Sequence, residues 1–258
     1  MRLLSFDTSA REITAALLID GQVAAQQKIV FEADLEETKG GKTKKVSRQE
    51  SVSLLIPTLD SLLNENALDK RAVDAFVVGV GPGGFTGIRV AVTTARTLAQ
   101  ALKKPLLGIN SLEVASYEPS AQGAGVLMQA SASHCYMAIY KRVARESEDG
   151  SRAEFDLSPV LAPCYLPNAE IPDRLSFAPI WYGDEAVLRK FPDWAHLLKP
   201  AQAVTNVAVI QAKLANLRLS LKGANPVAFP FQQVEPLYLR GASVTLKKGD
   251  AVERVESN

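Results

Sequence analysis

The carboxyl group best placed to do chemistry in this chain is Asp7, which follows the short apolar run Arg2–Phe6. A carboxylate just past a strand can accept hydrogen bonds from amides of the following turn, which is a structural role. It can also help to place Mg²⁺ against phosphates, since a nucleotide held between two lobes needs an acidic residue from each lobe. Both roles stay open for Asp7.

A second such carboxylate is missing where it would be needed. A strand, turn and strand recur later in the chain, and in that repeat Gln129 stands where Asp7 stands in the first. Glutamine cannot supply charge. The histidines, His134 and His196, lie far apart and lack ligand-like neighbours. Ser5, Ser9 and Ser131 lack a nearby histidine or a G-x-S-x-G setting. We therefore expect no catalytic residue, no metal site and no cofactor.

A glycine-rich loop carries the most information. It reads Gly81-Pro82-Gly83-Gly84-Phe85-Thr86-Gly87-Ile88-Arg89, between an apolar strand and a helix. Glycines let the backbone turn sharply and approach whatever lies above the helix N-terminus. Thr86 is the expected N-cap. The candidate phosphate site consists of Asp7, Thr8, Gly81, Gly83, Thr86 and Gly87.

Two nucleotide-binding motifs fail on inspection. Gly79, Gly81 and Gly84 match G-x-G-x-x-G, but this pattern should follow the first strand, with an acidic residue about 20 positions later. Residues 100–106 contain no Asp or Glu. A P-loop needs Gly-Lys-Ser/Thr at the helix start, which Gly87-Ile88-Arg89 does not provide.

The elements around this loop predict an α/β lobe. Strands are expected at 2–6, 13–19, 22–31, 75–80 and 106–109, and helices at about 48–65 and 87–103. Ser47–Glu50 fits a capping box, and Pro57 should kink the first helix. Three strands, helix, strand, helix, strand is the order of the ribonuclease-H-like core of actin, sugar kinases and Hsp70.

A second, reduced lobe of the same kind is expected to follow. Strands are predicted at 126–130, 135–142 and 153–157, and a helix at about 204–219. The Pro-rich remainder of 158–236 gives no clear pattern. The predicted domains are therefore 1–110, 111–240 and a polar tail at 241–258.

Composition limits the function. Lys and Arg total 29 and Asp and Glu total 28, so the basic excess typical of a protein that holds tRNA by itself is missing. The basic run between Lys39 and Arg48 is interpreted as a solvated loop. Cys135 and Cys164 are expected to be reduced thiols. The opening apolar stretch is too short for a signal peptide and no run is long enough to span a membrane, so a cytoplasmic location is expected.

Four motifs in the right order resemble TsaB-type (YeaZ-like) subunits of the machinery that makes threonylcarbamoyladenosine in tRNA. Gly81–Arg89 is similar to GPGSFTGLR, and Phe6-Asp7-Thr8-Ser9 is similar to the family's IDTS opening. Leu55-Ile56-Pro57 resembles "LLP", and Pro236–Arg240 resembles "PxYLR".

This resemblance implies a non-catalytic scaffold, a degenerate paralogue of the catalytic TsaD subunit. Such a subunit pairs with TsaD during threonylcarbamoyl transfer to the adenosine beside the anticodon. A TsaE-type ATPase binds across the pair, tRNA is contacted only indirectly, and the lone subunit forms a homodimer. The chain departs from the family at Ser51-Val52, where many relatives carry histidine, at Gln129-Ala130-Ser131, where many carry Asp-Ala-Arg, and in a longer loop at 32–48. These departures weaken any residual phosphate site.

The two helices of the first lobe are the predicted partner surface. The second is apolar or small on two faces, so it packs on two sides. One side can be its own sheet, and the other its own first helix or a partner; the resemblance favours a partner. The predicted contacts are Val52, Leu55, Leu59, Leu62, Ile88, Ala91, Val92, Thr94, Ala95, Leu98 and Ala101. Two rivals remain, an actin-like small-molecule kinase or peptidase-like enzyme, and a free-standing homodimeric binding module.

Overall fold

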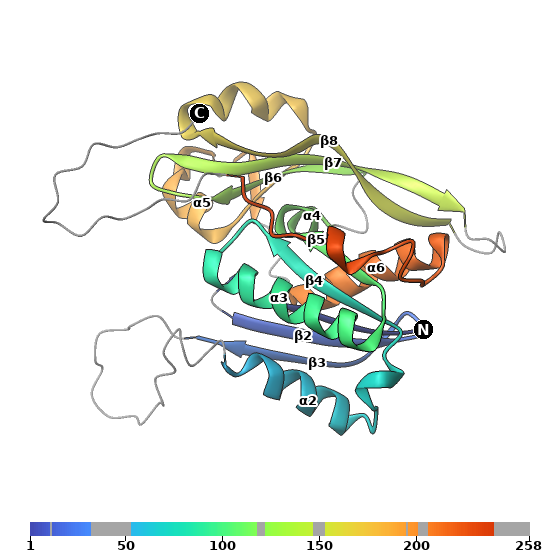
Figure 1. Cartoon of the computed structure of the whole chain (residues 1–258). Coiled ribbons are helices and arrows are strands. Elements are labelled where there is room, and N and C mark those ends of the chain that lie inside the picture. Colours follow the sequence, from blue (N-terminus) through green and yellow to red (C-terminus); the bar gives the residue numbers. More distant parts are fainter. Residues whose placement is uncertain are drawn as a thin grey trace, which may run out of the picture.

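The computed structural model describes residues 1–10, 12–31, 53–117, 122–146, 153–194, 196–200 and 206–239. These residues form two five-stranded sheets with helices on their faces and between them (Figure 1). The predicted capping box at Ser47–Glu50, the long loop and the polar tail lie outside the described residues.

The first sheet has the strand order β3-β2-β1-β4-β5. β1 pairs antiparallel with β2, and β2 with β3, while β1–β4 and β4–β5 are parallel pairs. β3, β4 and β5 all run parallel to β1, because a helix lies between β3 and β4 and another between β4 and β5, and each returns the chain to the edge at which the preceding strand began. The strands are Arg2–Asp7, Glu12–Ile19, Gln22–Val30, Ala75–Gly81 and Leu106–Asn110.

The second sheet repeats this plan in the order β10-β9-β6-β7-β8, with antiparallel pairs β6–β7 and β7–β8 and parallel pairs β6–β9 and β9–β10. Its strands are Gly123–Gln129, His134–Glu146, Ala153–Pro167, Trp181–Gly183 and Leu198–Pro200. The predicted α/β fold with two ribonuclease-H-like lobes is therefore confirmed.

Two helices cover one face of the first sheet, α2 (Leu55–Glu65) and α3 (Phe85–Leu102) (Figure 1). Their apolar stripes pack against Phe6 and Phe76 of the strands in one buried cluster. Because α2 begins at Leu55, Pro57 lies in the first turn of the helix. Backbone N–H groups in the first turn have no acceptor within the helix, so the N–H that proline lacks costs no helical hydrogen bond.

The opposite face of the first sheet packs on α6 (Val207–Lys222), which lies with α4 (Ser111–Ser116) between the two sheets. The chain thus passes to the second sheet after β5, yet α6 returns to the first. Only short 3₁₀ turns, Asn168–Glu170 and Pro172–Phe177, stand between β8 and β9, where the first lobe has α2, so helix content is lower in the second lobe. The remaining elements are α5 (Glu185–Lys190) and 3₁₀ turns at Lys70–Ala72, Pro192–Trp194 and Phe231–Gln233.

Candidate functional site

Asp7 and the glycine-rich loop meet at the point where the strand order of the first sheet reverses. β1 continues outward to β2, whereas β4, its other neighbour, continues to β5. In open α/β sheets, ligands bind in the crevice beyond the carboxyl ends of the strands at such a switch point. Asp7 ends β1 and Gly81 ends β4, so both lie where a ligand would be expected.

Both oxygens of the Asp7 carboxylate accept hydrogen bonds from its own chain. One oxygen accepts hydrogen bonds from the backbone N–H and the hydroxyl of Ser9, both at 2.6 Å. The other accepts from the side-chain amide of Gln211 at 2.7 Å, and Asp7 is only 3% exposed. The structural role, one of the two left open for Asp7, is therefore observed, while a phosphate-site role stays a prediction.

Gln211 is a member of this site that sequence reasoning missed. It is completely buried on α6, and its carbonyl oxygen accepts a hydrogen bond from Ser5 at 3.4 Å. A Cβ atom on Gly79 would lie 1.6 Å from the Asp7 carboxylate, so only glycine leaves room for this pair. Gln211 lies 204 residues from Asp7 and carries no motif, so only the fold could reveal the contact.

The glycine-rich loop lies directly on the turn that follows Asp7. The backbone N–H of Gly84 donates to the carbonyl oxygen of Ser9 at 2.6 Å, and the Thr8 hydroxyl donates to the carbonyl oxygen of Gly87 at 2.7 Å. A Cβ on Gly83 would lie 2.6 Å from the Ser9 oxygen, and one on Gly87 would lie 1.8 Å from the Thr8 oxygen. The glycines of this loop therefore accommodate the protein's own backbone.

Two further residues of the candidate phosphate site need comment. Gly81 has φ +90°, a left-handed conformation that favours glycine, and precedes a cis bond to Pro82. The expected N-cap role of Thr86 is wrong. α3 begins at Phe85 with Gly84 at the N-cap, so Thr86 lies exposed inside the first helical turn.

The second lobe holds an acid that sequence analysis overlooked. Gln129 ends β6, as Asp7 ends β1, and its backbone N–H donates to Asp184 at 2.9 Å. The other oxygen of Asp184 accepts from the backbone N–H of Val187 at 2.8 Å, which caps α5. Both carboxylate oxygens of Asp184 are thus bound to backbone amides. This capping role could have been predicted from the sequence, because a Ser or Asp one residue before a helix is a typical N-cap.

The histidines and cysteines lie apart. The His134 ring stacks on Tyr165 with centroids 4.5 Å apart, and His196 lies exposed in a turn. Within the described ranges, no three residues of the metal-ligating types gather at one place. Burial raises the pKa of Cys135 to about 11, which lowers the reactivity of this thiol. No described helix has the length and apolar character needed to cross a membrane.

The predicted partner residues divide into buried and outward-facing sets. Those buried in the chain's own core are Leu55, Leu59, Leu62, Ile88, Ala91, Val92 and Ala95. Thr94 and Leu98 are half-buried, Ala101 is exposed, and Val52 lies outside the described residues. The predicted partner surface is therefore corrected for the seven buried residues, because the apolar stripes of both helices face the sheet.

The outward faces of these helices carry other side chains. Ile56 of α2 is 46% exposed and Phe85 of α3 is 49% exposed. The Phe85 ring contacts the ring of Tyr238 with centroids 5.1 Å apart, and the Arg89 guanidinium lies 5.1 Å from the Phe85 centroid. A backbone hydrogen bond from Leu237 to Val80, at 2.8 Å, holds the Tyr238 segment in place. Two motifs far apart in sequence thus form one exposed cluster beside the glycine-rich loop.

Comparison with known proteins places these features in a family. The family model "tRNA N6-adenosine threonylcarbamoyltransferase" (TsaD) matches residues 15–162. A protein of that name from Anaeromyxobacter dehalogenans is 28% identical over 202 residues, which cover 74% of this chain and 59% of the relative. Another, from Thermomicrobium roseum, is 33% identical over 113 residues, covering 44% of this chain and 31% of the relative. This chain spans between about a third and three fifths of the length of these relatives.

Solved structures agree with the fold over almost the whole chain. One is a Pseudomonas aeruginosa protein described as uncharacterized with similarity to peptidase YEAZ. It has a TM-score of 0.65 and 24% identity, covering 93% of this chain and 99% of that one. A structure described as YeaZ from Pseudomonas aeruginosa gives the same TM-score and identity, with 92% and 99% coverage.

Proposed function

The chain belongs to the tRNA N6-adenosine threonylcarbamoyltransferase family, and we propose that it serves this tRNA modification as a TsaB-type subunit without catalytic activity of its own. In this proposal it pairs with a TsaD-type subunit, which performs threonylcarbamoyl transfer to the adenosine beside the anticodon. A TsaE-type ATPase joins the pair, tRNA is contacted indirectly, and the complex is cytoplasmic.

The hydrogen bonds that the residues of the candidate phosphate site make with their own chain support this proposal most strongly. A catalytic or nucleotide site at the switch point would need free polar groups and space for phosphates. Here the Gly84 amide is bound to Ser9, and the Asp7 carboxylate is bound to Ser9 and Gln211. In the second lobe, each carboxylate oxygen of Asp184 accepts a hydrogen bond from a backbone N–H. The residues placed for chemistry are engaged in holding the fold together.

The outward face of α2 and α3 supports a partner role. Half-exposed Ile56 and Phe85 provide apolar area, and Arg89 provides a cation beside it. Aromatic and arginine side chains dominate the binding energy of many interfaces. Small exposed residues on the same helix, Thr97 and Ala101, would let a partner helix approach closely.

Association with a TsaD-type subunit of the same organism tests the proposal. We expect the mixture to sediment as a heterodimer, and Ala101→Glu to weaken the association. The matched control is Val160→Glu, since Val160 is 61% exposed on the second sheet, away from α2 and α3. Equal association of parent and Ala101→Glu would place the interface elsewhere, and lack of any association by the parent would refute the partner role.

A further inference from the structure

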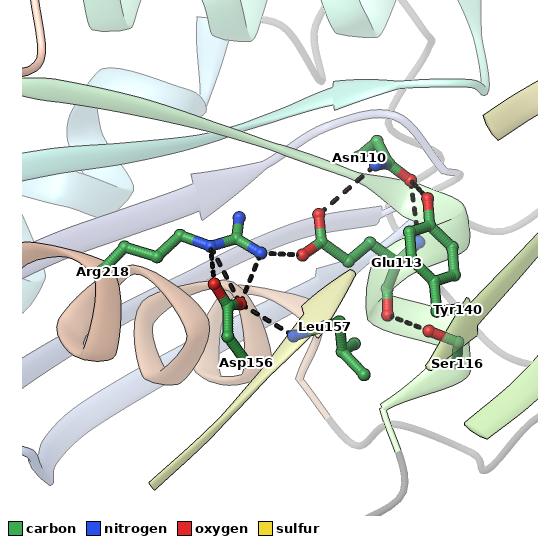
Figure 2. Close-up of polar contacts among 7 residues, drawn as sticks. All are labelled: Asn110, Glu113, Ser116, Tyr140, Asp156, Leu157 and Arg218. Atoms are coloured by element: carbon green, nitrogen blue, oxygen red, sulfur yellow. Dashed lines mark hydrogen bonds and ion pairs between the residues drawn. The ribbon is translucent and has the colours of Figure 1, made fainter. Parts of the chain in front are cut away.

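A continuous chain of polar side chains runs between the two lobes (Figure 2). Its members come from both sheets and from the two helices packed between them. They are Tyr140, Asn110, Glu113, Arg218 and Asp156.

The first half of this chain joins the second sheet to the end of the first. The hydroxyl of Tyr140, on β7, donates to the side-chain oxygen of Asn110 at 2.9 Å. Asn110 ends β5 and also caps α4, because the same oxygen accepts from the backbone N–H of Glu113 at 2.8 Å. Tyr140 is 3% exposed and Asn110 is half-buried, so this link is largely shielded from water.

The second half returns to the second sheet through α6. The guanidinium of Arg218 binds Glu113 and reaches Asp156 of β8, with distances of 2.8 and 3.1 Å from its Nη2 and Nε atoms to Oδ1. Arg218 belongs to a helix packed on the first sheet, whereas Asp156 belongs to the second. Arg218 therefore bridges elements of both lobes in one place.

Burial makes this bridge costly to break. The side chains of Arg218, Glu113 and Asp156 are 23%, 7% and 13% exposed. Burial raises the pKa of Glu113, and nearby Asp156 raises it further, against the opposing effect of Arg218. One cation serves two carboxylates, so separating Arg218 from either leaves a buried charge without its partner.

We infer that Arg218 is a clamp that holds the two lobes at one fixed angle. Two-lobed proteins that close around ligands move about hinges between their lobes. In this chain such a motion would pull α6 from β8 and separate Arg218 from Asp156. The lobes therefore form one rigid body whether or not a ligand or partner is bound. This inference stands independently of the proposed function.

Spin-label distance measurements on the full chain test the clamp. Labels on exposed Gln100 of α3 and Val160 of β8, in a Cys135→Ala, Cys164→Ala background, report the separation of the lobes. The parent should give one narrow distance distribution. Arg218→Met should broaden it by about twofold or shift its centre. The control is Arg189→Met, which removes the exposed pair with Glu185 and should leave the distribution as in the parent.

The result does not depend on one variant. Asp156→Ala keeps the pair of Arg218 with Glu113 and removes both side-chain acceptors that Arg218 meets on the second sheet, so it should fold even if Arg218→Met does not. Broadening in folded Asp156→Ala supports the clamp. A narrow distribution identical to that of the parent in both folded variants, or in Asp156→Ala alone where Arg218→Met fails to fold, overturns it.

Discussion

The backbone N–H of Gly84 donates to the carbonyl oxygen of Ser9 at 2.6 Å and so closes the space between the glycine-rich loop and the turn after β1. Helix N-termini preceded by glycines often bind phosphate. In this chain the backbone of residues 8 and 9 lies against the glycines of the loop, in the space where a phosphate would otherwise bind. The loop therefore has a structural explanation that needs no ligand.

Gly87→Ala should destabilise the protein clearly. Its Cβ would lie 1.8 Å from the Thr8 carbonyl oxygen, so the β1–β2 turn or α3 must move. We expect the free energy of unfolding to fall by on the order of 1–3 kcal/mol, the range of defined packing defects. Denaturant titration measures this change.

Gly84→Ala is the matched control, because its Cβ would lie 3.2 Å from the Ser9 oxygen at an ordinary negative φ. Its effect should be smaller. Equal stability losses in the two variants would argue against the close approach at Gly87.

Arginine substitutions should separate the inner and outer faces of α3. Ala91 is completely buried against the sheet, so Ala91→Arg places a charge in the core and should unfold the protein or melt it at a much lower temperature. Ala101 is exposed, and Ala101→Arg should keep the parent's circular dichroism and melting temperature within a few degrees. A stably folded Ala91→Arg would show that the inner face of α3 is not part of the core.

Much of the first lobe could be predicted from sequence because its elements are long and periodic. The apolar runs that became β1, β2 and β4 have clear ends, such as the Asp20-Gly21 turn, whose residues both take positive φ. The fold class followed from the order of these elements. The duplicated lobe was visible only through its strand–turn–strand opening.

The rest could not be predicted because it depends on contacts distant in sequence. β9 and β10 have three residues each and α4 and α5 have six, too few for a periodic signal. The predicted partner residues were chosen for apolar character, which also marks the side facing the sheet. The pairing of Asp7 with Gln211 and the contact of Phe85 with Tyr238 required the assembled fold.

The buried carboxyl of Glu113 predicts a pH dependence of stability. Burial raises its pKa in the folded protein above the usual value of 4.5. Between pH 4.5 and the higher pKa of the folded protein, Glu113 holds a proton in the folded state that it has lost in the unfolded state. The free energy of unfolding therefore falls as the pH rises from 4.5 through the folded pKa. Glu113→Gln should remove this decline. Urea titrations of parent and variant from pH 4 upward measure it.

Asp74 provides an internal contrast. Burial raises its pKa, but hydrogen bonds and charge from Arg2 outweigh this and lower it below 3.8. Its contribution is therefore present above 3.8 and lost as pH falls through the folded pKa. Asp74→Asn should change stability relative to the parent mainly above this acid range, with no effect on the decline assigned to Glu113. If the stability of Glu113→Gln still falls with rising pH as in the parent, the decline does not come from Glu113.

Tyr238→Ala should weaken association with a TsaD-type subunit by about tenfold or more, the size of a hot-spot loss. The Tyr238 ring is 49% exposed and contacts Phe85 on the outward end of α3. Because the ring lies at the surface, the fold should survive its loss. Phe177→Ala is a suitable control, since Phe177 is 61% exposed on a 3₁₀ turn of the second lobe. Equal losses in both variants would deny Tyr238 a specific role.

A reconstituted modification reaction tests the central claim most directly. The TsaD-type subunit, the TsaE-type ATPase, tRNA, ATP and a threonylcarbamoyl donor are incubated with and without this chain, and the modified nucleoside is measured by mass spectrometry of digested tRNA. We expect modification only when this chain is present with the TsaD-type subunit, and none from this chain with tRNA alone. Modification that proceeds equally without this chain, or that this chain performs by itself, would contradict the account.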